Sequence, residues 1–357
     1  MAGHVFLAGL AEEPAVLRLV LGAPAVRPAQ VAGLVLVAAD AGPWPVAVCA
    51  VGETAAGVVV QLTGAQENRL DFALRALGMV AADLPDGAGA TYLGQGGGVM
   101  PATAPDVLAV ILAYLEDVLP LQGQVDAATL ARRLSPALVR AASKLRARAL
   151  APTDLRRATR AGDIVTQAQR LPYAKFFAVE EYDLSWRRFD GSFSPPTTRA
   201  AFVSGDAVTV LPYDPKRDLV LVVEQIRAGP FARGDGQSWQ IEAIAGRVDP
   251  FETPEQAARR EAVEEAGLTL TDLIPVAQYY PSPGAKTEFL YSYVALTALP
   301  DGCAGVFGLA EEAEDIRGHL ISFERLMELV ASGEAANAPL ILTALWLQRE
   351  RGRLRAG

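Results

Sequence analysis

The sequence predicts an α/β protein that combines an α/β/α sandwich with a small N-terminal β-barrel-like domain and a helical connector. Three observations support this fold class. Short apolar runs punctuated by Gly and Pro occupy residues 1–95, helix-like apolar recurrence occupies residues 100–170, and elements in the order β, β, α, β, α follow from residue 173. Such an alternation of strands and helices with short connections is typical of layered α/β domains.

The N-terminal segment, residues 1–98, is expected to be strand-rich. Its apolar runs are short and are separated by turn-forming residues: HVFLAGL, VAGLVLVAAD, WPVAVCAV and AGVVVQLTG. Strands of a small β domain are typically bounded in this way.

The connector, residues 99–172, is expected to be helical. After the flexible tract GQGGGVMPATAP, three stretches repeat apolar residues at helical spacing: DVLAVILAYLEDVL, DAATLARRLSPALVRAASKLRARAL and PTDLRRATRAGDIVTQAQRL. We interpret its basic second half as a solvated helix face rather than a nucleic-acid patch.

The C-terminal segment, residues 173–357, carries strands, one central helix and then C-terminal helices. FFAVEEYDLSWRRFDG and TTRAAFVSGDAVTVLPYDPKRDLVLVVEQIR are predicted as strands joined by Asp/Gly and Pro/Asp turns. LYSYVALT is predicted as a further strand, and helices are expected from SFERLMELVASG onward.

Composition and charge restrict the function. The net charge of -9 argues against nucleic acid or an anionic membrane as a partner, because both require a basic face. Cys49 and Cys303 lie far apart without CxxC or His companions, so we expect neither a disulfide framework nor a zinc site, and we expect a reducing cytoplasm. The N-terminus lacks a basic n-region, and the apolar run 107–119 is too short and too acidic for a membrane span.

Residues 246–268, GRVDPFETPEQAARREAVEEAGL, predict a helix with defined ends. Thr253 is placed as the N-cap, Pro254 at the first helical position, and Gln256 at the third position of a capping box. Gly267 is placed just beyond the last turn, where glycine favours the left-handed conformation.

Three glutamates of this helix, Glu261, Glu264 and Glu265, are three and four residues apart and therefore share one face. Like charges at this spacing destabilise a helix, so a cationic partner is expected. Arg260 can pair with Glu264 and with Glu252, but it is one charge among several. A hard divalent cation, Mg²⁺ or Mn²⁺, accounts for the remainder and would complete its shell with substrate phosphates.

The spacing from Gly246 to Leu268 matches every fixed position of the Nudix box, so the chain resembles the Nudix hydrolases. The resemblance implies metal-dependent hydrolysis of a nucleoside diphosphate linked to another group. It extends over roughly residues 173–350 and is similar to the ADP-ribose pyrophosphatase branch, including its tellurite-resistance relatives. The segments that carry this similarity are EQIRAGPF (224–231), WQIEAIAGRV (239–248), SPGAKTE (282–288) and LAEEAEDIRGHLIS (309–322).

The resemblance implies the following metal ligands and catalytic groups. The metal ligands would be the Ala245 carbonyl, Glu261, Glu265 and Glu314; the catalytic residues would be Glu264 and Glu312, the latter as general base in the EEAED loop. A mobile acidic loop can deliver a base once the substrate phosphate has arrived. The alternative for EEAED alone is an ordinary charged loop.

The resemblance also implies a substrate site. Its residues would be Arg199, Arg227, Glu242, Arg247, Ser282, Gly284, Glu288 and Phe177. Arg227 suits a bidentate clamp on pyrophosphate, and Phe177 would lend an aromatic ring to adenine. For Arg199, Glu242 and Glu288 a surface or structural ion pair is the alternative, and for Phe177 a place in the core. Arg247, Asp249 and Pro250 stand where many members carry acids, which leaves loop shape and nucleotide preference open.

The first 95 residues are weakly similar to the gamma-glutamylcyclotransferase-like domain. In place of the family's Tyr-Gly-Thr-Leu signature this chain has Leu7, Ala8, Gly9 and Leu10, and Leu74 replaces the catalytic glutamate. A leucine cannot transfer a proton, so we expect a degenerate domain without cyclotransferase activity.

Together these features predict an ADP-ribose diphosphatase that releases AMP and ribose 5-phosphate and forms a homodimer through its Nudix domain. The alternatives are a hydrolase of another nucleoside diphosphate sugar and a non-catalytic nucleotide sensor. The sequence leaves open the physiological substrate, the number of metal ions, the phosphorus attacked, the dimer geometry and the role of the N-terminal domain.

Overall fold

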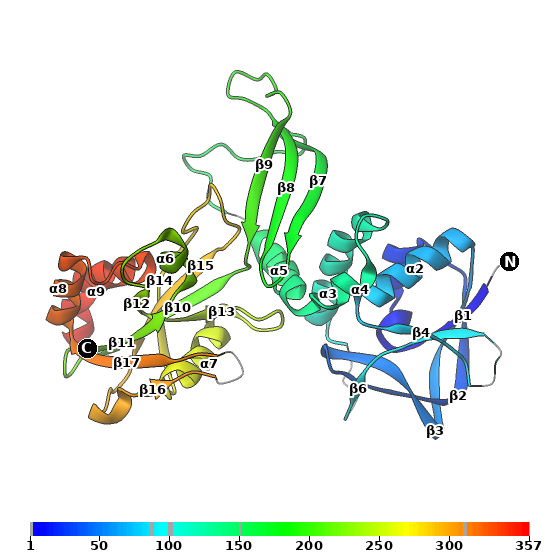
Figure 1. Cartoon of the computed structure of the whole chain (residues 1–357), viewed down its shortest axis with the longest axis horizontal. Helices are drawn as coiled ribbons and strands as arrows, with labels where there is room; N and C mark the ends of the chain where they lie inside the picture. Colours follow the sequence, from blue (N-terminus) through cyan, green and yellow to red (C-terminus); the bar gives the residue numbers. More distant parts are fainter. Residues whose placement is uncertain are drawn as a thin grey trace. The chain divides into compact units, whose positions relative to one another are not determined.

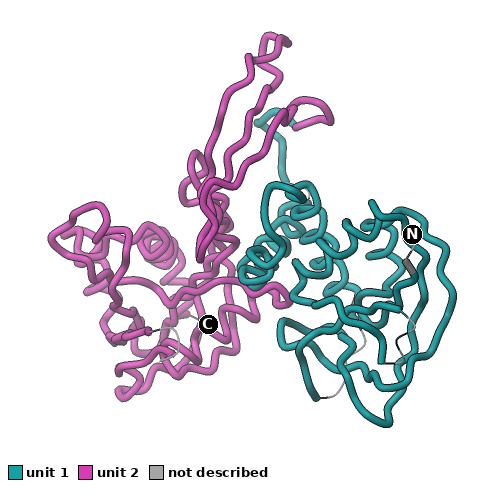
Figure 2. Tube along the Cα trace, turned by 45° about the vertical axis from the view of Figure 1, so that its right-hand side comes forward, with its two compact units in different colours: residues 1–158 teal, residues 159–357 magenta. Residues whose placement is uncertain are grey.

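The computed structural model describes residues 3–85, 87, 89–98, 103–149, 151–309 and 313–356. It divides the chain into two compact units, Met1–Ala158 and Thr159–Gly357 (Figure 2). This division passes through the segment expected as a connector: its helices belong to the first unit, and its last residues form a strand of the second.

The first unit combines a sheet with several helices. Its elements are β1 (Gly3–Leu7), η1 (Gly9–Glu12), α1 (Pro14–Leu21), β2 (Val26–Ala39), β3 (Gly42–Leu62), α2 (Gly64–Ala76), β4 (Val80–Asp83), β5 (Ala90–Leu93), β6 (Gly96–Gly97), α3 (Pro105–Val118), η2 (Leu119–Leu121), α4 (Ala127–Ala131) and α5 (Leu134–Ala147). The strand order is β4-β5-β1-β3-β2-β6, with the long hairpin β2–β3 at its centre. Strands β1 to β6 all lie within residues 3–97, the segment expected to be rich in strands.

The core of the first unit forms because the apolar runs of its strands turn their side chains inward. Phe6, Leu34 and Ala47 are buried in one cluster, and Leu74 of α2 is fully buried. Helices α3 and α5 pack against each other. Helix α3 covers residues 107–118 of the apolar run, and no helix in the described part of the chain is long and apolar enough to cross a membrane.

The second unit carries a larger mixed sheet and a smaller antiparallel one (Figure 1). Its elements are β7 (Ile164–Ala174), β8 (Ala178–Trp186), β9 (Thr197–Val203), β10 (Ala207–Asp214), β11 (Leu219–Ile226), α6 (Ala228–Arg233), β12 (Trp239–Glu242), β13 (Ile244–Arg247), α7 (Pro254–Ala266), β14 (Asp272–Tyr279), β15 (Leu290–Leu296), η3 (Asp301–Cys303), β16 (Val306–Phe307), β17 (Ile316–Ser322), α8 (Phe323–Ser332) and α9 (Ala338–Ala356).

The larger sheet lies between two helical layers, as the predicted α/β/α sandwich requires. Its order is β14-β15-β10-β11-β17-β16, with β12 paired to β11 and β13 to β10. Alternate residues of β10 and β11 face opposite sides, because successive side chains of a strand point to opposite faces. Val208 and Leu221 pack with the alanines of α7, whereas Leu211 and Val222 pack with α8 and α9 (Figure 1).

The helix expected over the last connector stretch, within residues 152–171, is wrong. Residues 164–174 form β7, which pairs antiparallel with β8, and β8 pairs with β9. Most residues of β7 are exposed, so the strand shows no two-residue alternation of buried and exposed side chains. Its scattered apolar residues fit a helical period, but pairing with β8 overrides that local pattern.

Candidate active site

Helix α7 is built as its sequence predicts. The Thr253 hydroxyl accepts a hydrogen bond from the Gln256 backbone N–H at 3.2 Å, and the Gln256 side chain accepts one from the Thr253 N–H at 2.7 Å. Gly267 ends the helix with a positive φ of 61°. The small residues Ala258 and Ala262 are fully buried against the sheet, which allows the helix to approach it closely. This close packing brings Glu261 and Glu265 of α7 next to β13.

Arg260 lies at the centre of the acidic cluster. Its guanidinium binds Glu252 at 2.7 Å, Glu261 at 2.8 Å and Glu264 at 2.9 Å. It also donates to the backbone carbonyl of Arg247 at 3.0 Å. The pairs predicted for Arg260 are confirmed, and this one side chain links α7, the loop before it and β13.

Glu265 is the most deeply buried of the three glutamates, with 2% of its surface exposed. Its carboxylate accepts a hydrogen bond from the backbone N–H of Ala245 at 3.1 Å. The next residue, Gly246, lies so close to α7 that an added Cβ would stand 1.8 Å from a carboxylate oxygen of Glu261. A side chain here would displace that carboxylate, so glycine leaves Glu261 its place beside β13.

Burial raises the pKa of Glu261 to about 7, with Arg260 opposing the shift. Burial also raises the pKa of Glu265 to about 8, although the N–H of Ala245 opposes it. The neighbouring acids, including Glu314, contribute in the same direction as burial. Two carboxyl groups that are withdrawn from water and repel each other are stabilised in their charged form by a cation.

The residues present fit a hard divalent cation. Two carboxylates and the Ala245 carbonyl supply the oxygen donors that Mg²⁺ prefers, and the missing side chain of Gly246 leaves room beside them. Among the described residues, no group of three or more His, Cys, Asp or Glu side chains is gathered into a metal site. A shell of these donors would be completed by water and substrate oxygens.

The predicted base, Glu312, lies outside the described residues. Glu314 is described: its carboxylate accepts a hydrogen bond from the Leu309 N–H at 3.2 Å, and its charge acts on Glu261, Glu265 and Arg227. The structure therefore gathers the predicted residues Glu261, Glu265, Glu314 and Arg227 around one region.

Arg227 and Glu242 form an ion pair. The Nε and Nη2 atoms of Arg227 lie 3.0 and 2.6 Å from Oε2 of Glu242. The other carboxylate oxygen of Glu242 accepts from the Asn337 side chain at 3.0 Å, and Glu242 is only 5% exposed. Both carboxylate oxygens of Glu242 are thus hydrogen-bonded within the protein. This arrangement is a structural ion pair, the alternative to the predicted role of Glu242 in binding ribose.

An aromatic cluster lies beside Arg247. The Phe177 ring is 4.7 Å from the Phe202 ring, and the Arg247 guanidinium lies 4.7 and 4.9 Å from the rings of Phe176 and Phe177. Such cation–π contacts hold the turn between β7 and β8 against the end of β13. Phe177 is half-buried in this cluster, whereas Phe176 is exposed.

The turn that contains Ser282 and Gly284 is tied to β9. The Ser282 carbonyl accepts from the N–H groups of Ala285 and Lys286, and Phe202 exchanges backbone hydrogen bonds with the same turn. Glu288 accepts a hydrogen bond from Ser204 at 3.4 Å. Arg199, also on β9, is exposed and lies 5.6 Å from the Trp186 ring, so the structure does not bring it into the acidic cluster.

Two residues near the site were not predicted. Asn337 donates a hydrogen bond to Glu242. Its place before a helix would have suggested a helix cap but not this contact. Gln225 is buried, and its Nε2 has no hydrogen-bond partner among the described residues. Gln225 lies on β11, and Arg227 follows that strand with an extended backbone, so the two side chains point to the same face.

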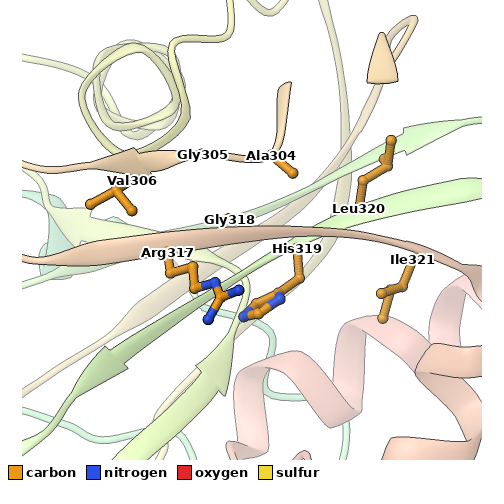
Figure 3. A pocket seen from close by; sticks show the side chains of 8 residues that line it. All are labelled: Ala304, Gly305, Val306, Arg317, Gly318, His319, Leu320 and Ile321. Carbon is orange, nitrogen blue, oxygen red and sulfur yellow. The ribbon is translucent and has the colours of Figure 1, made fainter. Parts of the chain in front are cut away.

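A hollow of about 420 Å³ lies along β16 and β17 (Figure 3). Arg317, His319 and Ile321 project from one side of β17, and Nε2 of His319 lies 2.9 Å from the Glu224 carboxylate. None of the predicted metal or substrate residues lines this hollow. The predicted residues that the structure brings together, Glu261, Glu265 and Glu314, lie around α7 instead.

Known proteins are similar to the part of the chain that contains α7. The family model for the NUDIX domain matches residues 203–342. The ADP-ribose pyrophosphatase of Escherichia coli (strain K12) is 36% identical over 189 residues, which cover 52% of this chain and 88% of that protein. The ADP-ribose pyrophosphatase of Haemophilus influenzae is 32% identical over 194 residues, covering 54% and 89%.

Two further matches carry different descriptions. A GDP-mannose pyrophosphatase of Salmonella choleraesuis is 31% identical over 150 residues, covering 42% of this chain and 77% of its own. A solved structure described as an ADP compounds hydrolase matches with a TM-score of 0.42 and 19% identity, covering 56% of this chain and 100% of its own. The Nudix box folds as its spacing predicts, the NUDIX model matches the residues around it, and the ADP-ribose pyrophosphatases match over most of their length. This chain therefore belongs to the Nudix family.

Proposed function

We propose that this protein hydrolyses the pyrophosphate bond of ADP-ribose to AMP and ribose 5-phosphate, with Mg²⁺ as the cofactor and Mn²⁺ as a substitute. The observation that carries the proposal is the place of two carboxylates of α7 against β13: Glu265 is buried and accepts from the Ala245 N–H, and the half-buried Glu261 lies beside Gly246. The ADP-ribose pyrophosphatases among the relatives support the choice of substrate.

Glu261, Glu265, the Ala245 carbonyl and Glu314 would hold the cation. When bound, it neutralises the pyrophosphate and lowers the pKa of water. Arg227 would bind a phosphate oxygen through the part of its guanidinium that Glu242 leaves open, and would stabilise the negative charge that develops there.

In the proposed reaction a water oxygen bonds to one phosphorus and the bridging P–O bond breaks. Glu312 would take the proton from the water, with Glu264 as a second catalytic acid in the cluster. We also propose that Arg199, Arg247, Ser282, Gly284, Glu288 and Phe177 contact the substrate. The aromatic cluster and the turn tied to β9 support this grouping for all of these except Arg199.

A product assay tests the proposal. Phosphorus NMR of ADP-ribose turnover in ¹⁸O-labelled water reports both products and the phosphorus attacked. The appearance of AMP and ribose 5-phosphate in Mg²⁺ is expected, and unchanged ADP-ribose would refute the proposal.

The second candidate is another nucleoside diphosphate sugar, which the similarity to a GDP-mannose pyrophosphatase favours. Comparing kcat/KM for ADP-ribose, ADP-glucose and GDP-mannose separates the two. A nucleotide sensor, the remaining alternative, would show tight ADP-ribose binding by calorimetry in Mg²⁺ without product.

We further propose a cytoplasmic homodimer formed through the Nudix domain. Ile164, Val165 and Tyr173 of β7 expose much of their apolar surface, and such residues are often covered by a partner. Cys49 and Cys303 are both free thiols, in keeping with a reducing compartment. The first unit would act without cyclotransferase chemistry, because Leu74 is an apolar residue buried in its core. Light scattering on the purified chain tests the dimer.

A further inference from the structure

We propose that Asn337 is a positioning residue for Arg227, acting through the buried carboxylate of Glu242. This inference rests on the proposed function, because it assumes that Arg227 binds the pyrophosphate. It assigns a role in the reaction to the residue just before α9, which is 95 residues from Glu242 in the sequence.

The amide of Asn337 has a fixed orientation. Its Oδ1 accepts the backbone N–H of Leu340 at 3.1 Å, which makes Asn337 the N-cap of α9. Its Nδ2 is therefore the group that faces Glu242, and only that end of an amide can donate. One side chain thus caps the helix and donates to the carboxylate.

The carboxylate of Glu242 is in turn held at both oxygens. Oε1 accepts from Asn337 at 3.0 Å, and Oε2 accepts from Nε and Nη2 of Arg227. A carboxylate held at one oxygen alone can rotate about its last bond. With Oε1 occupied, the rotation of the group and hence the direction of the Arg227 fork are fixed.

Arg227 keeps further N–H groups for a ligand. A guanidinium carries five N–H donors, and the pair with Glu242 uses the Nε edge. The Arg227 side chain is 41% exposed, so the remaining donors on Nη1 are accessible. An aligned fork loses less conformational freedom when it binds phosphate, which favours affinity.

The substitution Asn337→Asp separates the two roles of Asn337. Aspartate is as good an N-cap as asparagine, so α9 keeps its cap. The donor that faces Glu242 becomes a carboxylate oxygen, so the contact to Glu242 is lost and replaced by repulsion. Asn337→Ala removes both the cap and the donor.

Ser322→Ala is the matched control. Ser322 caps α8 by accepting the Arg325 N–H at 3.1 Å, but it makes no contact with Glu242 or Arg227 among the bonds of the described residues. We expect Ser322→Ala to lower Tm as much as Asn337→Ala does, and to leave the KM for ADP-ribose unchanged.

We expect Asn337→Asp to raise the KM for ADP-ribose about 10-fold, with a smaller change in kcat, because an interaction that aligns a binding group has been removed. In an Arg227→Ala background the same substitution is expected to have little further effect, since residues of one network are not additive. An unchanged KM for Asn337→Asp, or full additivity with Arg227→Ala, would overturn the inference.

A second measurement keeps the inference independent of turnover. In protein labelled with ¹⁵N-arginine, the Nε–H resonance of Arg227, identified by its absence in Arg227→Lys, is expected to shift in Asn337→Asp and not in Ser322→Ala. If the wild-type protein fails to hydrolyse ADP-ribose, the proposed function is wrong. If the resonance does not shift, Asn337 does not position Arg227.

Discussion

The backbone N–H of Ala245 donates to the carboxylate of Glu265 at 3.1 Å, which joins the end of the sheet directly to the last turn of the acidic helix. The carbonyl of the same residue is the one expected to face the cation. Backbone and side-chain ligands are therefore fixed relative to each other before any ion binds, and a change to either partner displaces both.

Glu265→Gln removes a charged metal ligand while keeping its shape. We expect turnover of ADP-ribose to fall at least about 100-fold, because the amide cannot balance the charge of a divalent cation. At neutral pH the cation-free variant is expected to have a higher Tm than the wild type, since a buried, repelled carboxylate is gone. Glu328→Gln on the exposed face of α8 is the control, and near-normal turnover by Glu265→Gln would contradict the assignment.

Gly246→Ala tests the space beside Glu261. The new methyl would stand 1.8 Å from the Glu261 carboxylate, so that side chain must move away from the site. We expect weaker Mg²⁺ binding by calorimetry and lower kcat. Gly352→Ala on α9, where an added Cβ meets nothing within 4 Å, should instead raise the free energy of unfolding by about 0.5–1 kcal/mol and leave catalysis unchanged.

The pH dependence of stability follows from the raised pKa values of Glu261 and Glu265. In the unfolded chain both have the ordinary value of 4.5, and in the folded, cation-free protein about 7 and about 8. Their contribution to stability is full below pH 4.5 and is lost as pH rises toward 8. Scanning calorimetry of the chelated protein should show this decline, and Glu265→Gln should reduce it.

Mg²⁺ should reverse that decline, because a bound cation favours the ionised carboxylates and releases their protons. We expect the rise in Tm on adding Mg²⁺ to be larger near about pH 8 than near about pH 6. An equal rise at both values would show that these two glutamates do not bind the ion.

Arg260→Ala leaves Glu252, Glu261 and Glu264 without their shared partner. The guanidinium is about one third exposed, so we expect a loss of about 2 kcal/mol, between the values for surface and buried pairs. Arg325→Ala, which breaks an exposed pair on α8, should cost less than about 0.5 kcal/mol. Urea denaturation measures both, and equal losses would contradict the central role of Arg260.

The sequence was most informative where structure is local. The capping box of Thr253 and Gln256, the end of the helix at Gly267 and the pairing of Arg260 with Glu264 all lie within one or a few turns, and all are confirmed. Local spacing determines these contacts whatever the rest of the chain does.

Contacts between distant segments could not be predicted in this way. The bond of Asn337 to Glu242 joins residues that no spacing rule relates, and it changes how Glu242 is understood. The strand at residues 164–174 depends on its pairing with β8, which the apolar pattern of the segment alone does not reveal. The roles of Glu312 and of the substrate residues stay predictions.

The helix that carries Glu261 and Glu265 is capped at both ends and braced by Arg260 through bonds that involve neither the cation nor the substrate. The conformational entropy of these ligand side chains is therefore lost when the protein folds, and not when the ion binds. Chelation should empty such a site without unwinding it, so the enzyme can exchange ions as a folded protein, on the timescale of ligand dissociation instead of refolding.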